Sequence, residues 1–356
     1  MTELTATPRI VHLMPYEAIG GVEVASRSVP TGHHGKLHFE RQYLARAPGV
    51  SVECGEYHGP QISLNNPYAY WHALWRLYRD PPDLLVASLW RSALILICLK
   101  ILRARTKMVI FLHLPHDVHL VDKVANRVAI FLSDAIWADS DVTLQRRVPS
   151  CLQGKGRVVS FLLNRRSLPE QRDPTPEFIF WGRLNAQKGL DRAIYLFAAL
   201  VQHRADARFT IIGPDGGMED QLRAQVAELG LCDHVVFKGP MRHEDIANAA
   251  SGASFYLQTS LDEGMAMSVV EAMQCGLVPV VTTVGEIARY CRDKESAIFV
   301  HTDEAAIKAV LVLLSDPDRY RRMSHAAANY WQAKPLYRDD FLDAASALIE
   351  ARAHAA

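Results

Sequence analysis

Short apolar runs alternate with helical patterns along most of the chain. In the first half, the runs that predict strands are RIVHLM, LLVAS, KMVIFLH, AIWAD and RVVSFL. In the second half they are FIFWG, RFTIIG, HVVFKG, SFYLQT, VPVVTT and AIFV, with helical segments such as LDRAIYLFAALVQ and EDQLRAQVAELG between them. This alternation is typical of parallel sheets flanked by helices, so the sequence predicts an α/β protein.

A polar, proline-bearing stretch, NRRSLPEQRDPTPE at residues 164–177, interrupts the alternation and predicts a linker. A chain of 356 residues is too long for one ordinary core. We therefore expect two doubly wound, Rossmann-like domains that face a central cleft, at residues 1–165 and 166–334. Residues 335–356 predict an amphipathic helix with no strand after it, which can pack back on either domain, including the N-terminal one.

The composition indicates a soluble globular protein, because 49% of the residues are apolar and 22% are charged. The six cysteines are scattered, without a C-x-x-C motif or a His/Cys cluster at metal-ligand spacing. This pattern favours reduced thiols in a cytoplasmic protein. The N-terminus lacks the pattern of a secretory signal. The most apolar run, ALILICLKIL at residues 93–102, is too short to span a bilayer and predicts a buried helix.

Net charge is unevenly divided along the chain. Residues 1–165 hold 19 Lys and Arg against 13 Asp and Glu, which is +6, and residues 166–356 hold 20 against 26, which is −6. A basic first half suits an anionic partner such as a membrane surface, for which the candidate patch is Lys100, Arg103, Arg105 and Lys107. We would then expect peripheral contact with the inner face of the plasma membrane. The split can equally serve only to bring two domains together, and the patch can be an ordinary solvated helix end.

Unusual residues follow several predicted strands, at the strand ends where open α/β sheets bind ligands. Gly20 and Gly21 follow the first strand and allow backbone N–H groups to approach an anion, although a tight turn explains such a pair as often. Arg183 and Lys188 follow the first strand of the second half. Each taken singly is an ordinary surface charge. Two cations at one strand end beside glycines fit a diphosphate.

The segment DEGMAMSVVEAMQCGLVPVV places Glu263 and Glu271 eight residues apart. Eight steps of roughly 100° would leave the two side chains on different faces of one helix. The spacing instead predicts Glu263 in a loop and Glu271 just inside the following helix. Glu271 could then accept both hydroxyls of a ribose, and Glu263 could accept sugar hydroxyls. Alternatively, Glu271 only complements the helix dipole and Glu263 is solvated.

The segment EGMAMSVVEAMQCGLVPVV resembles the E-x7-E motif of retaining GT-B glycosyltransferases of family 4, also called glycosyl transferases group 1. GRLNAQKGLDRAI resembles the G-R-L…K-G motif of that family, and GGVEVAS resembles its glycine-rich N-terminal loop. DAIWADS and FLHLPHD resemble its first-domain strands that end in serine and in histidine. The resemblance covers most of the chain and is strongest over residues 178–281. Met265 and Ala266 depart from the phenylalanine and the glycine or proline that usually follow E-G, and NRRS replaces the usual N-G-V-D.

The resemblance implies that a nucleotide sugar binds the second domain and that the acceptor binds the first. It places Arg183 and Lys188 on the diphosphate and Glu271 on the ribose. Glu263 and the backbone of residues 264–266 would hold the donor sugar and the distal phosphate. It also implies that His113, with His116 as the alternative, contacts the donor sugar near the reacting centre. The turn after VVFKG, Gly239 to Met241, would line the base.

The residues with implied catalytic roles are therefore His113, Arg183, Lys188 and Glu263. The donor-binding set adds Gly20, Gly21, Gly239, Met241, Gly264, Met265, Ala266 and Glu271. The resemblance further implies retention of anomeric configuration and no bound metal or other cofactor. The D-S-D sequence at residues 139–141 superficially matches the D-x-D motif of metal-dependent transferases, but we interpret it as the end of a strand.

The sequence thus predicts a transferase that moves a sugar from a nucleotide-diphosphate sugar to a glycan or lipid-linked acceptor in surface polysaccharide biosynthesis. Three alternatives remain: a nucleotide-sugar 2-epimerase with the same fold, a glycoside hydrolase that uses Glu263 and Glu271, and a non-catalytic nucleotide-binding module. We expect no nucleic-acid partner. The base, donor sugar, acceptor, linkage and oligomeric state remain open.

Overall fold

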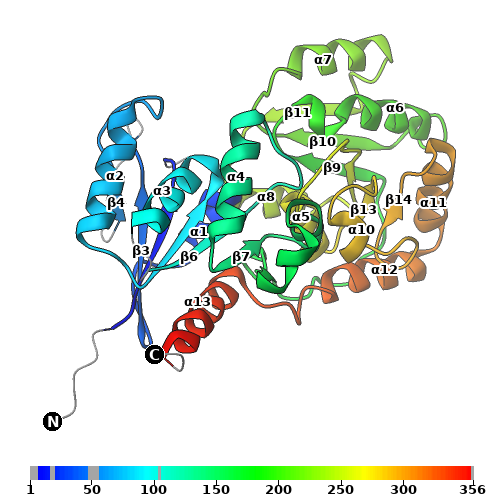
Figure 1. The fold of residues 1–356 in the computed structure, drawn as a ribbon. Coiled ribbons are helices and arrows are strands. Elements are labelled where there is room, and N and C mark those ends of the chain that lie inside the picture. Colours follow the sequence, from blue (N-terminus) through cyan, green and yellow to red (C-terminus); the bar gives the residue numbers. More distant parts are fainter. Residues whose placement is uncertain (1–6, 17–20, 47–55, 103–105, 354–356) are drawn as a thin grey trace. The chain divides into compact units, whose positions relative to one another are not determined.

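The structure is a computed structural model that describes residues 7–16, 21–46, 56–102 and 106–353 (Figure 1). It divides into two compact units. Unit 1 comprises Met1–Leu163 together with Pro335–Ala356, and unit 2 comprises Asn164–Lys334. Each unit has its own sheet and its own core.

The sheet of unit 1 contains the strands β1 (Arg9–Met14), β2 (Gly32–His34), β3 (Leu37–Tyr43), β4 (Glu56–His58), β5 (Leu84–Ser88), β6 (Lys107–Leu112), β7 (Ala135–Ala138) and β8 (Gly156–Val158). Their order is β2-β3-β1-β5-β6-β7-β8, with β4 beside β3. All pairs are parallel except β2–β3. The predicted strands at β1, β5, β6 and β7 are confirmed. Strands β2, β3 and β4 were not predicted, and the strand predicted over residues 157–162 ends at Val158.

The helices of unit 1 are α1 (Gly21–Arg27), α2 (Pro67–Arg79), α3 (Leu89–Leu102), α4 (Leu120–Leu132), α5 (Asp141–Arg147), the 3₁₀ turn η1 (Ser150–Lys155) and α13 (Tyr337–Ala353). Helix α3 contacts both α2 and α4. Helix α13 contacts α1, and its Phe341 ring packs against His12 of β1. The apolar run in α3 is only partly buried, because Ile101 and Leu102 at its end are 75% and 57% exposed.

The sheet of unit 2 contains β9 (Glu177–Trp181), β10 (Arg208–Ile212), β11 (Val235–Gly239), β12 (Phe255–Gln258), β13 (Val278–Val281) and β14 (Ile298–Phe299). These parallel strands lie in the order β11-β10-β9-β12-β13-β14 and confirm the predicted ones. The helical elements are the 3₁₀ turn η2 (Ala186–Lys188), α6 (Leu190–Val201), α7 (Glu219–Glu228), α8 (His243–Ala250), α9 (Met267–Gln274), α10 (Ile287–Tyr290), α11 (Asp303–Ser315) and α12 (Pro317–Asn329). Helix α6 contacts α7 and α11, whereas α9 contacts α12.

Strand order explains where a ligand can bind in each unit. In unit 2 the chain runs from β9 to β10 and β11 on one side, and then crosses back to β12 on the other side of β9. The topological switch point of this sheet, where open α/β sheets bind ligands, therefore lies at the carboxyl ends of β9 and β12. In unit 1 the same reversal occurs between β1 and β5.

In the described part of the chain, no helix combines the length and the hydropathy needed to cross a bilayer.

Candidate active site

The loops after β9 and β12 touch through a glycine. Gly189 ends the 3₁₀ turn η2 in a left-handed conformation, with φ +59°. A Cβ atom on this residue would lie 2.2 Å from the carbonyl oxygen of Thr259, so a side chain would push the loops apart. Thr259 Oγ1 also donates a hydrogen bond of 2.5 Å to the Gly189 carbonyl. This close approach brings the residue before Gly189, Lys188, to the loop that carries Glu263.

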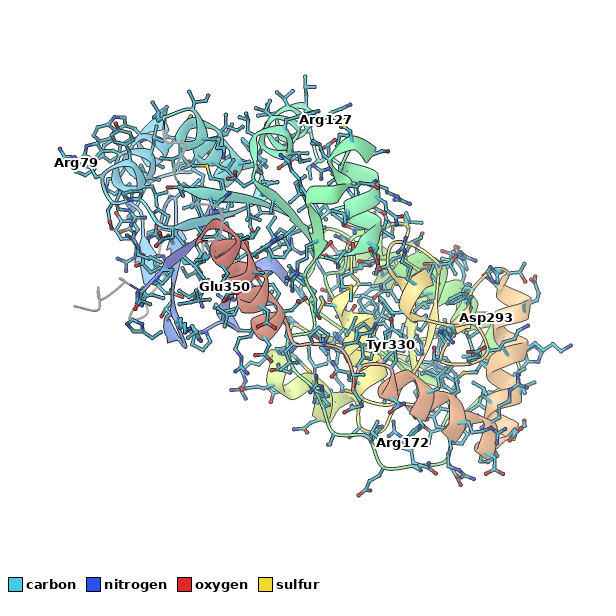
Figure 2. All side chains as sticks on the ribbon, turned by 60° about the horizontal axis from the view of Figure 1, so that its bottom comes forward. Arg79, Arg127, Arg172, Asp293, Tyr330 and Glu350 are labelled. Carbon is cyan, nitrogen blue, oxygen red and sulfur yellow. The ribbon has the colours of Figure 1, made fainter. Side chains whose placement is uncertain are left out.

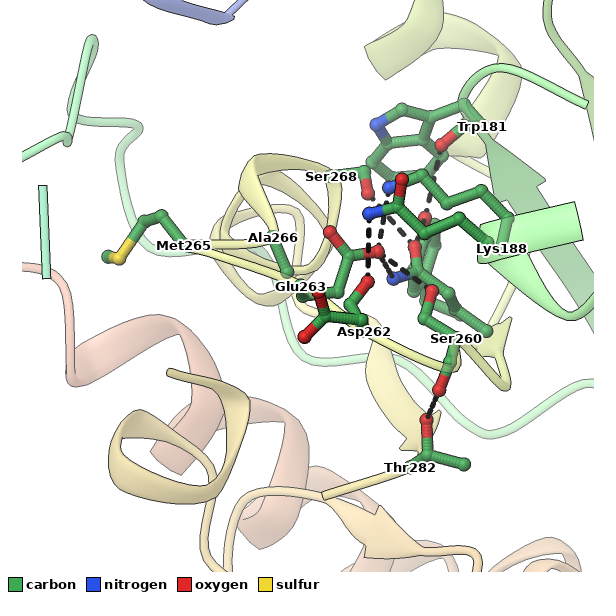
Figure 3. A network of polar contacts seen from close by, with 12 residues as sticks. Trp181, Lys188, Ser260, Asp262, Glu263, Met265, Ala266, Ser268 and Thr282 are labelled. Carbon is green, nitrogen blue, oxygen red and sulfur yellow. Dashed lines mark hydrogen bonds and ion pairs between the residues drawn. The ribbon is translucent and has the colours of Figure 1, made fainter. Parts of the chain in front are cut away.

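Glu263 lies in the loop after β12 and is only 5% exposed. Its Oε1 accepts hydrogen bonds from Lys188 Nζ at 2.7 Å, Ser260 Oγ at 2.7 Å and Gln258 Nε2 at 3.0 Å (Figure 3). The ammonium group of Lys188 thus neutralises the buried carboxylate. An ammonium group has three hydrogens, and this bond uses one, so Lys188 also keeps donors for an anionic ligand.

Glu271 is the fifth residue of α9, so the two carboxylates do lie in a loop and in the following helix. Its Oε2 accepts a hydrogen bond of 2.9 Å from the indole Nε1 of Trp181, at the end of β9. Its Oε1 lies 3.5 Å from His243 Nε2, on the first residue of α8. Burial raises the pKa of Glu271, and His243 and the Trp181 hydrogen bond act in the opposite direction. A fixed carboxylate at this edge of the sheet can accept hydroxyl hydrogens.

Residues 264–266 lead into α9, and hydrogen bonds from Glu286 and Tyr290 hold their backbone in place. The Glu286 N–H donates to the Gly264 carbonyl at 3.0 Å, and the Tyr290 hydroxyl donates to the Met265 carbonyl at 3.1 Å. Ala266 has φ +53° and ψ +61°, a left-handed conformation that costs an alanine about 1–2 kcal/mol. No described side chain caps the N-terminus of α9. Its first N–H groups are therefore available to an anion, which the helix dipole favours.

The other predicted donor-site residues of unit 2 follow neighbouring strands. Arg183 follows β9 and is exposed, and its stem lies against Gly216 in the loop after β10. Gly239 ends β11 with φ +68°, and the half-buried Met241 lies just before α8. The structure therefore brings Arg183, Lys188, Glu263 and Glu271 to the ends of β9 and β12. Gly239 and Met241 lie farther along the same edge, beyond β10.

Sequence reasoning missed the residues that hold the two carboxylates. Trp181 stands directly before the G-R-L motif, and an indole N–H at the end of a buried strand needs a partner. Gln258 lies near the end of the apolar run SFYLQT and Ser260 directly follows it, which is another signal of a strand end with a polar site. The pairing of His243 with Glu271 has no signal in the sequence, because it depends on how α8 packs.

In unit 1, His113 directly follows β6 and is buried, whereas His116 is exposed. His113 Nε2 lies 2.9 Å from Ser88 Oγ, and burial lowers the pKa of His113 to about 3, so the ring is neutral. Gly21 is the first residue of α1, and a Cβ atom there would meet no atom within 4 Å. Gly20 lies outside the described residues.

The D-S-D sequence directly follows β7, as the interpretation of a strand end requires, and its last residue, Asp141, begins α5. Ser140 is the N-cap of α5, since its Oγ accepts a hydrogen bond from the Thr143 N–H at 3.2 Å. The Ser140 hydroxyl lies 2.9 Å from Asp139 Oδ1. Within the described ranges, no group of three or more His, Cys, Asp or Glu side chains is placed to hold a metal ion.

Residues 164–330, nearly all of unit 2, match the model of the protein family described as Glycosyl transferases group 1. Among solved structures, Anabaena HepE in complex with UDP-glucose aligns with a TM-score of 0.75 and 17% identity, over 95% of this chain and 99% of HepE. The lipopolysaccharide outer core galactosyltransferase WaaB aligns with a TM-score of 0.70 and 19% identity, over 95% of this chain and 99% of WaaB. This chain has the GT-B fold.

Sequence relatives match about half of this GT-B chain. The GDP-mannose:cellobiosyl-diphosphopolyprenol alpha-mannosyltransferase of Xanthomonas oryzae pv. oryzae is 28% identical over 181 residues, which are 48% of this chain and 48% of that protein. The chain spans about half the length of the curated relatives that it matches. Both motifs that carry Lys188 and Glu263 lie inside the family match of this GT-B chain.

Proposed function

We propose that this protein is a retaining, family 4 glycosyltransferase that transfers a sugar from a nucleotide-diphosphate sugar to a glycan or lipid-linked acceptor. The observation that carries the proposal is the polar cluster of unit 2, in which Lys188 pairs with Glu263 beside Glu271 and the uncapped N-terminus of α9. Cations, a helix N-terminus and buried carboxylates at one strand edge suit a diphosphate next to sugar hydroxyls.

The proposed roles follow from this chemistry. Arg183, Lys188 and the first N–H groups of α9 bind the diphosphate and stabilise the charge that develops on it as it departs. Glu271 accepts the ribose hydroxyls, and Glu263 with residues 264–266 holds the donor sugar. Since these groups supply the positive charge, we propose that no metal ion is needed.

Acceptor binding is assigned to unit 1. A cavity of about 710 Å³ in that unit is lined by residues that follow the carboxyl ends of β1, β3, β4 and β5. Arg91 lies in its wall, and its guanidinium donates to Asn65 Oδ1 at 2.7 Å and to the Leu64 carbonyl. A cavity whose wall combines polar and apolar side chains in this way suits an oligosaccharide. The partial sequence similarity to an enzyme named for a diphosphopolyprenol acceptor supports a lipid-linked glycan as the acceptor. We propose a role in surface polysaccharide synthesis on this basis.

Because the proposed acceptor is lipid-linked, we also propose that the protein lies in the cytoplasm and contacts the inner face of the plasma membrane peripherally. The basic patch alone supports it weakly, because Lys100 Nζ pairs with Asp134 at 2.8 Å, and Arg103 and Arg105 lie outside the described residues. A stronger feature is an exposed apolar stripe along α4, which we call the α4 stripe. It consists of Leu120, Val121, Val124, Val128 and Phe131.

The α4 stripe has the surroundings of a membrane-surface helix. Exposed cations, Lys123 and Arg127, stand on the same helix, and the Arg127 side chain projects outward in Figure 2. Helix α3 separates α4 from α2, on which Trp71 and Trp75 are exposed and stacked with centroids 6.2 Å apart. Apolar side chains flanked by cations bind membrane surfaces, and tryptophan favours the interface.

The decisive test begins with a thermal-shift panel of UDP-, GDP-, ADP- and dTDP-sugars, because a ligand that binds the native state raises its melting temperature. The stabilising donor is then incubated with and without lipid-linked oligosaccharide, and products are analysed for transfer and anomeric configuration. Transfer with retention supports the proposal. A new nucleotide sugar formed without acceptor indicates an epimerase, glycan hydrolysis without nucleotide indicates a hydrolase, and binding without turnover indicates a binding module.

A further inference from the structure

A chain of buried polar side chains runs through unit 1 and ends at His113. Arg41 Nε lies 3.2 Å from Ser26 Oγ, which lies 3.1 Å from His12 Nδ1. His12 Nε2 lies 2.8 Å from Ser88 Oγ, which lies 2.9 Å from His113 Nε2. Every member is at least nine-tenths buried. The chain crosses β3, α1, β1, β5 and the end of β6, so five elements converge on one line of hydrogen bonds.

Arg41 determines which groups donate and which accept along this line of hydrogen bonds. A guanidinium is always charged and only donates. Arg41 is held in place by an ion pair with Glu56 and by hydrogen bonds from Nη2 to the carbonyls of Ser26 and Val29. Its Nε–H points at both oxygens of Ser26, the carbonyl at 3.3 Å and Oγ at 3.2 Å, so Ser26 Oγ faces a donor there and cannot donate to Arg41. The hydroxyl hydrogen of Ser26 must then point to its other neighbour, His12 Nδ1, which has to be an acceptor.

The order of donors and acceptors continues from His12 to His113. Burial lowers the pKa of both His12 and His113, so each ring is neutral and carries one N–H. With Nδ1 of His12 as the acceptor, its hydrogen sits on Nε2 and is donated to Ser88 Oγ. Ser88 then donates its hydroxyl hydrogen to Nε2 of His113. The single hydrogen of the His113 ring is left on Nδ1.

The opposite proton order leaves a defect. If His113 donated to Ser88 and Ser88 donated to His12, the His12 Nδ1–H would point at Ser26 Oγ together with the Arg41 Nε–H. Two donors would then face one hydroxyl, and its own hydrogen would have no acceptor among the described contacts. Folded proteins rarely leave such a buried hydrogen unpaired.

We propose that this chain fixes His113 as the tautomer protonated on Nδ1, so that the ring donates a hydrogen bond to a ligand oxygen and cannot act as a base. His113 Nδ1 is buried and has no partner among the described residues. A cavity of about 60 Å³ beside the ring exceeds the roughly 10–15 Å³ that one water oxygen needs. The ligand class is a sugar bearing an acceptor oxygen, and this identification of the ligand rests on the proposed function. Ser26, His12 and Ser88 are positioning residues.

Nuclear magnetic resonance tests the tautomer without any activity. In long-range ¹H–¹⁵N spectra of the intact protein labelled on histidine, the protonated and unprotonated ring nitrogens have well-separated shifts. We expect hydrogen on Nδ1 of His113 and on Nε2 of His12. The His113 signals are assigned by contacts to the Phe111 ring, whose centroid is 4.3 Å away. In Ser26→Ala the constraint from Arg41 is lost and His113 should become a mixture of tautomers. Hydrogen on Nε2 of His113 in the wild-type protein would overturn the proposal, whether or not the variant folds.

The second test measures the activity of His113 variants. Asparagine places an amide N–H near the position of Nδ1, and glutamine places one near Nε2. His113→Asn should therefore retain kcat/KM within about tenfold of wild type, whereas His113→Ala and His113→Gln should lose a further roughly 10- to 100-fold. A better result for glutamine than for asparagine contradicts the proposal. If wild type neither binds nor turns over any nucleotide sugar, the proposed function fails while the spectroscopic result stands.

Discussion

Lys188 Nζ donates to Glu263 Oε1 across 2.7 Å, although 75 residues separate the two in the chain. The pair forms because β9 and β12 are neighbours in the sheet, and because Gly189 lets the two loops touch. The side chains are 17% and 6% exposed. Removing either partner therefore leaves the other as a charge with little access to water.

The first prediction concerns this ion pair. Lys188→Met leaves the Glu263 carboxylate with only the donors of Gln258 and Ser260, and should destabilise unit 2 by about 3 kcal/mol. The measurement is hydrogen exchange of the amides in β12 and α9. The double variant Lys188→Met/Glu263→Gln removes both charges and should recover most of the protection.

Arg183 offers the matched control, because it is an exposed cation at the end of the same strand. Arg183→Met should leave hydrogen exchange unchanged and still weaken nucleotide binding. If the amides of β12 and α9 exchange as slowly in Lys188→Met as in Arg183→Met, the ion pair does not stabilise unit 2.

The second prediction assigns Glu271 to the ribose. Glu271→Ala should lower nucleotide affinity by about 10- to 100-fold or more, since even one hydrogen bond to a charged group contributes roughly 1.5–3 kcal/mol. Titration calorimetry with the free nucleoside diphosphate measures this loss. The exposed Glu228 on α7 provides the control, and Glu228→Gln should bind normally. Unchanged affinity in Glu271→Ala would rule out the ribose role.

The third prediction follows from the pKa of Glu271, which burial raises above its ordinary value of 4.5. The folded protein therefore holds this proton more tightly than the unfolded chain does, and stability falls as pH rises from about 4.5 through the folded-state pKa. Above that pKa the full cost of the buried carboxylate is present. Glu271→Gln removes the titration while its amide oxygen can still accept from Trp181.

The melting temperature of Glu271→Gln relative to wild type should accordingly increase between pH 4.5 and 7 and then level off. Measurements across this range in the absence of nucleotide isolate the effect. A difference that shrinks as pH rises would mean that Trp181 and His243 outweigh burial.

In unit 2, the alternation of apolar runs with helical patterns was enough to predict the strands. The spacing of Glu263 and Glu271 was enough to predict one in a loop and the other in the following helix. Strand β3 was not predicted because its sequence, LHFERQY, places Arg41 on the buried face, where the usual alternation would put an apolar residue, and also buries Gln42 on the other face. Those polar residues are buried because other side chains satisfy them, as Glu56 does for Arg41. No local pattern carries that information.

The strand predicted over residues 157–162 ended early for a similar reason. The Ser160 N–H donates to Asp340 Oδ2 at 2.6 Å, and the Ser160 hydroxyl donates to the Pro335 carbonyl. These partners come from the segment around α13, 180 residues away. A contact between a strand continuation and the last helix depends on tertiary packing, which hydrophobic periodicity cannot register.

The fourth prediction is that turnover persists in excess EDTA. In the proposed function, Arg183, Lys188 and the N-terminus of α9 supply the positive charge that a metal ion would otherwise bring to the diphosphate. Activity is compared before and after chelation and dialysis, with a metal-dependent transferase as the positive control for chelation. Complete loss of activity that Mg²⁺ or Mn²⁺ restores would return the D-S-D sequence at residues 139–141 to consideration as a metal site.

The fifth prediction concerns the membrane. We expect the protein to sediment with vesicles that contain anionic lipid, through the α4 stripe and the cations around it. Val124→Glu and Phe131→Glu place carboxylates where apolar side chains would enter the interface, and each should reduce sedimentation strongly. Val236→Glu is the matched control, because Val236 is an exposed valine of unit 2.

Salt separates the apolar contribution from the charged one. Each cation near an anionic surface contributes about 1 kcal/mol, and salt screens that attraction. Neutralising Lys100, Arg103, Arg105 and Lys107 together should therefore lower binding at low salt and flatten its salt dependence, while the α4 variants should lower binding at every salt concentration. Nucleotide binding, which we propose for unit 2, should be unaffected in both sets. Equal sedimentation of wild type and the α4 variants would remove α4 from the membrane contact, and no sedimentation of wild type on anionic vesicles would remove the contact itself.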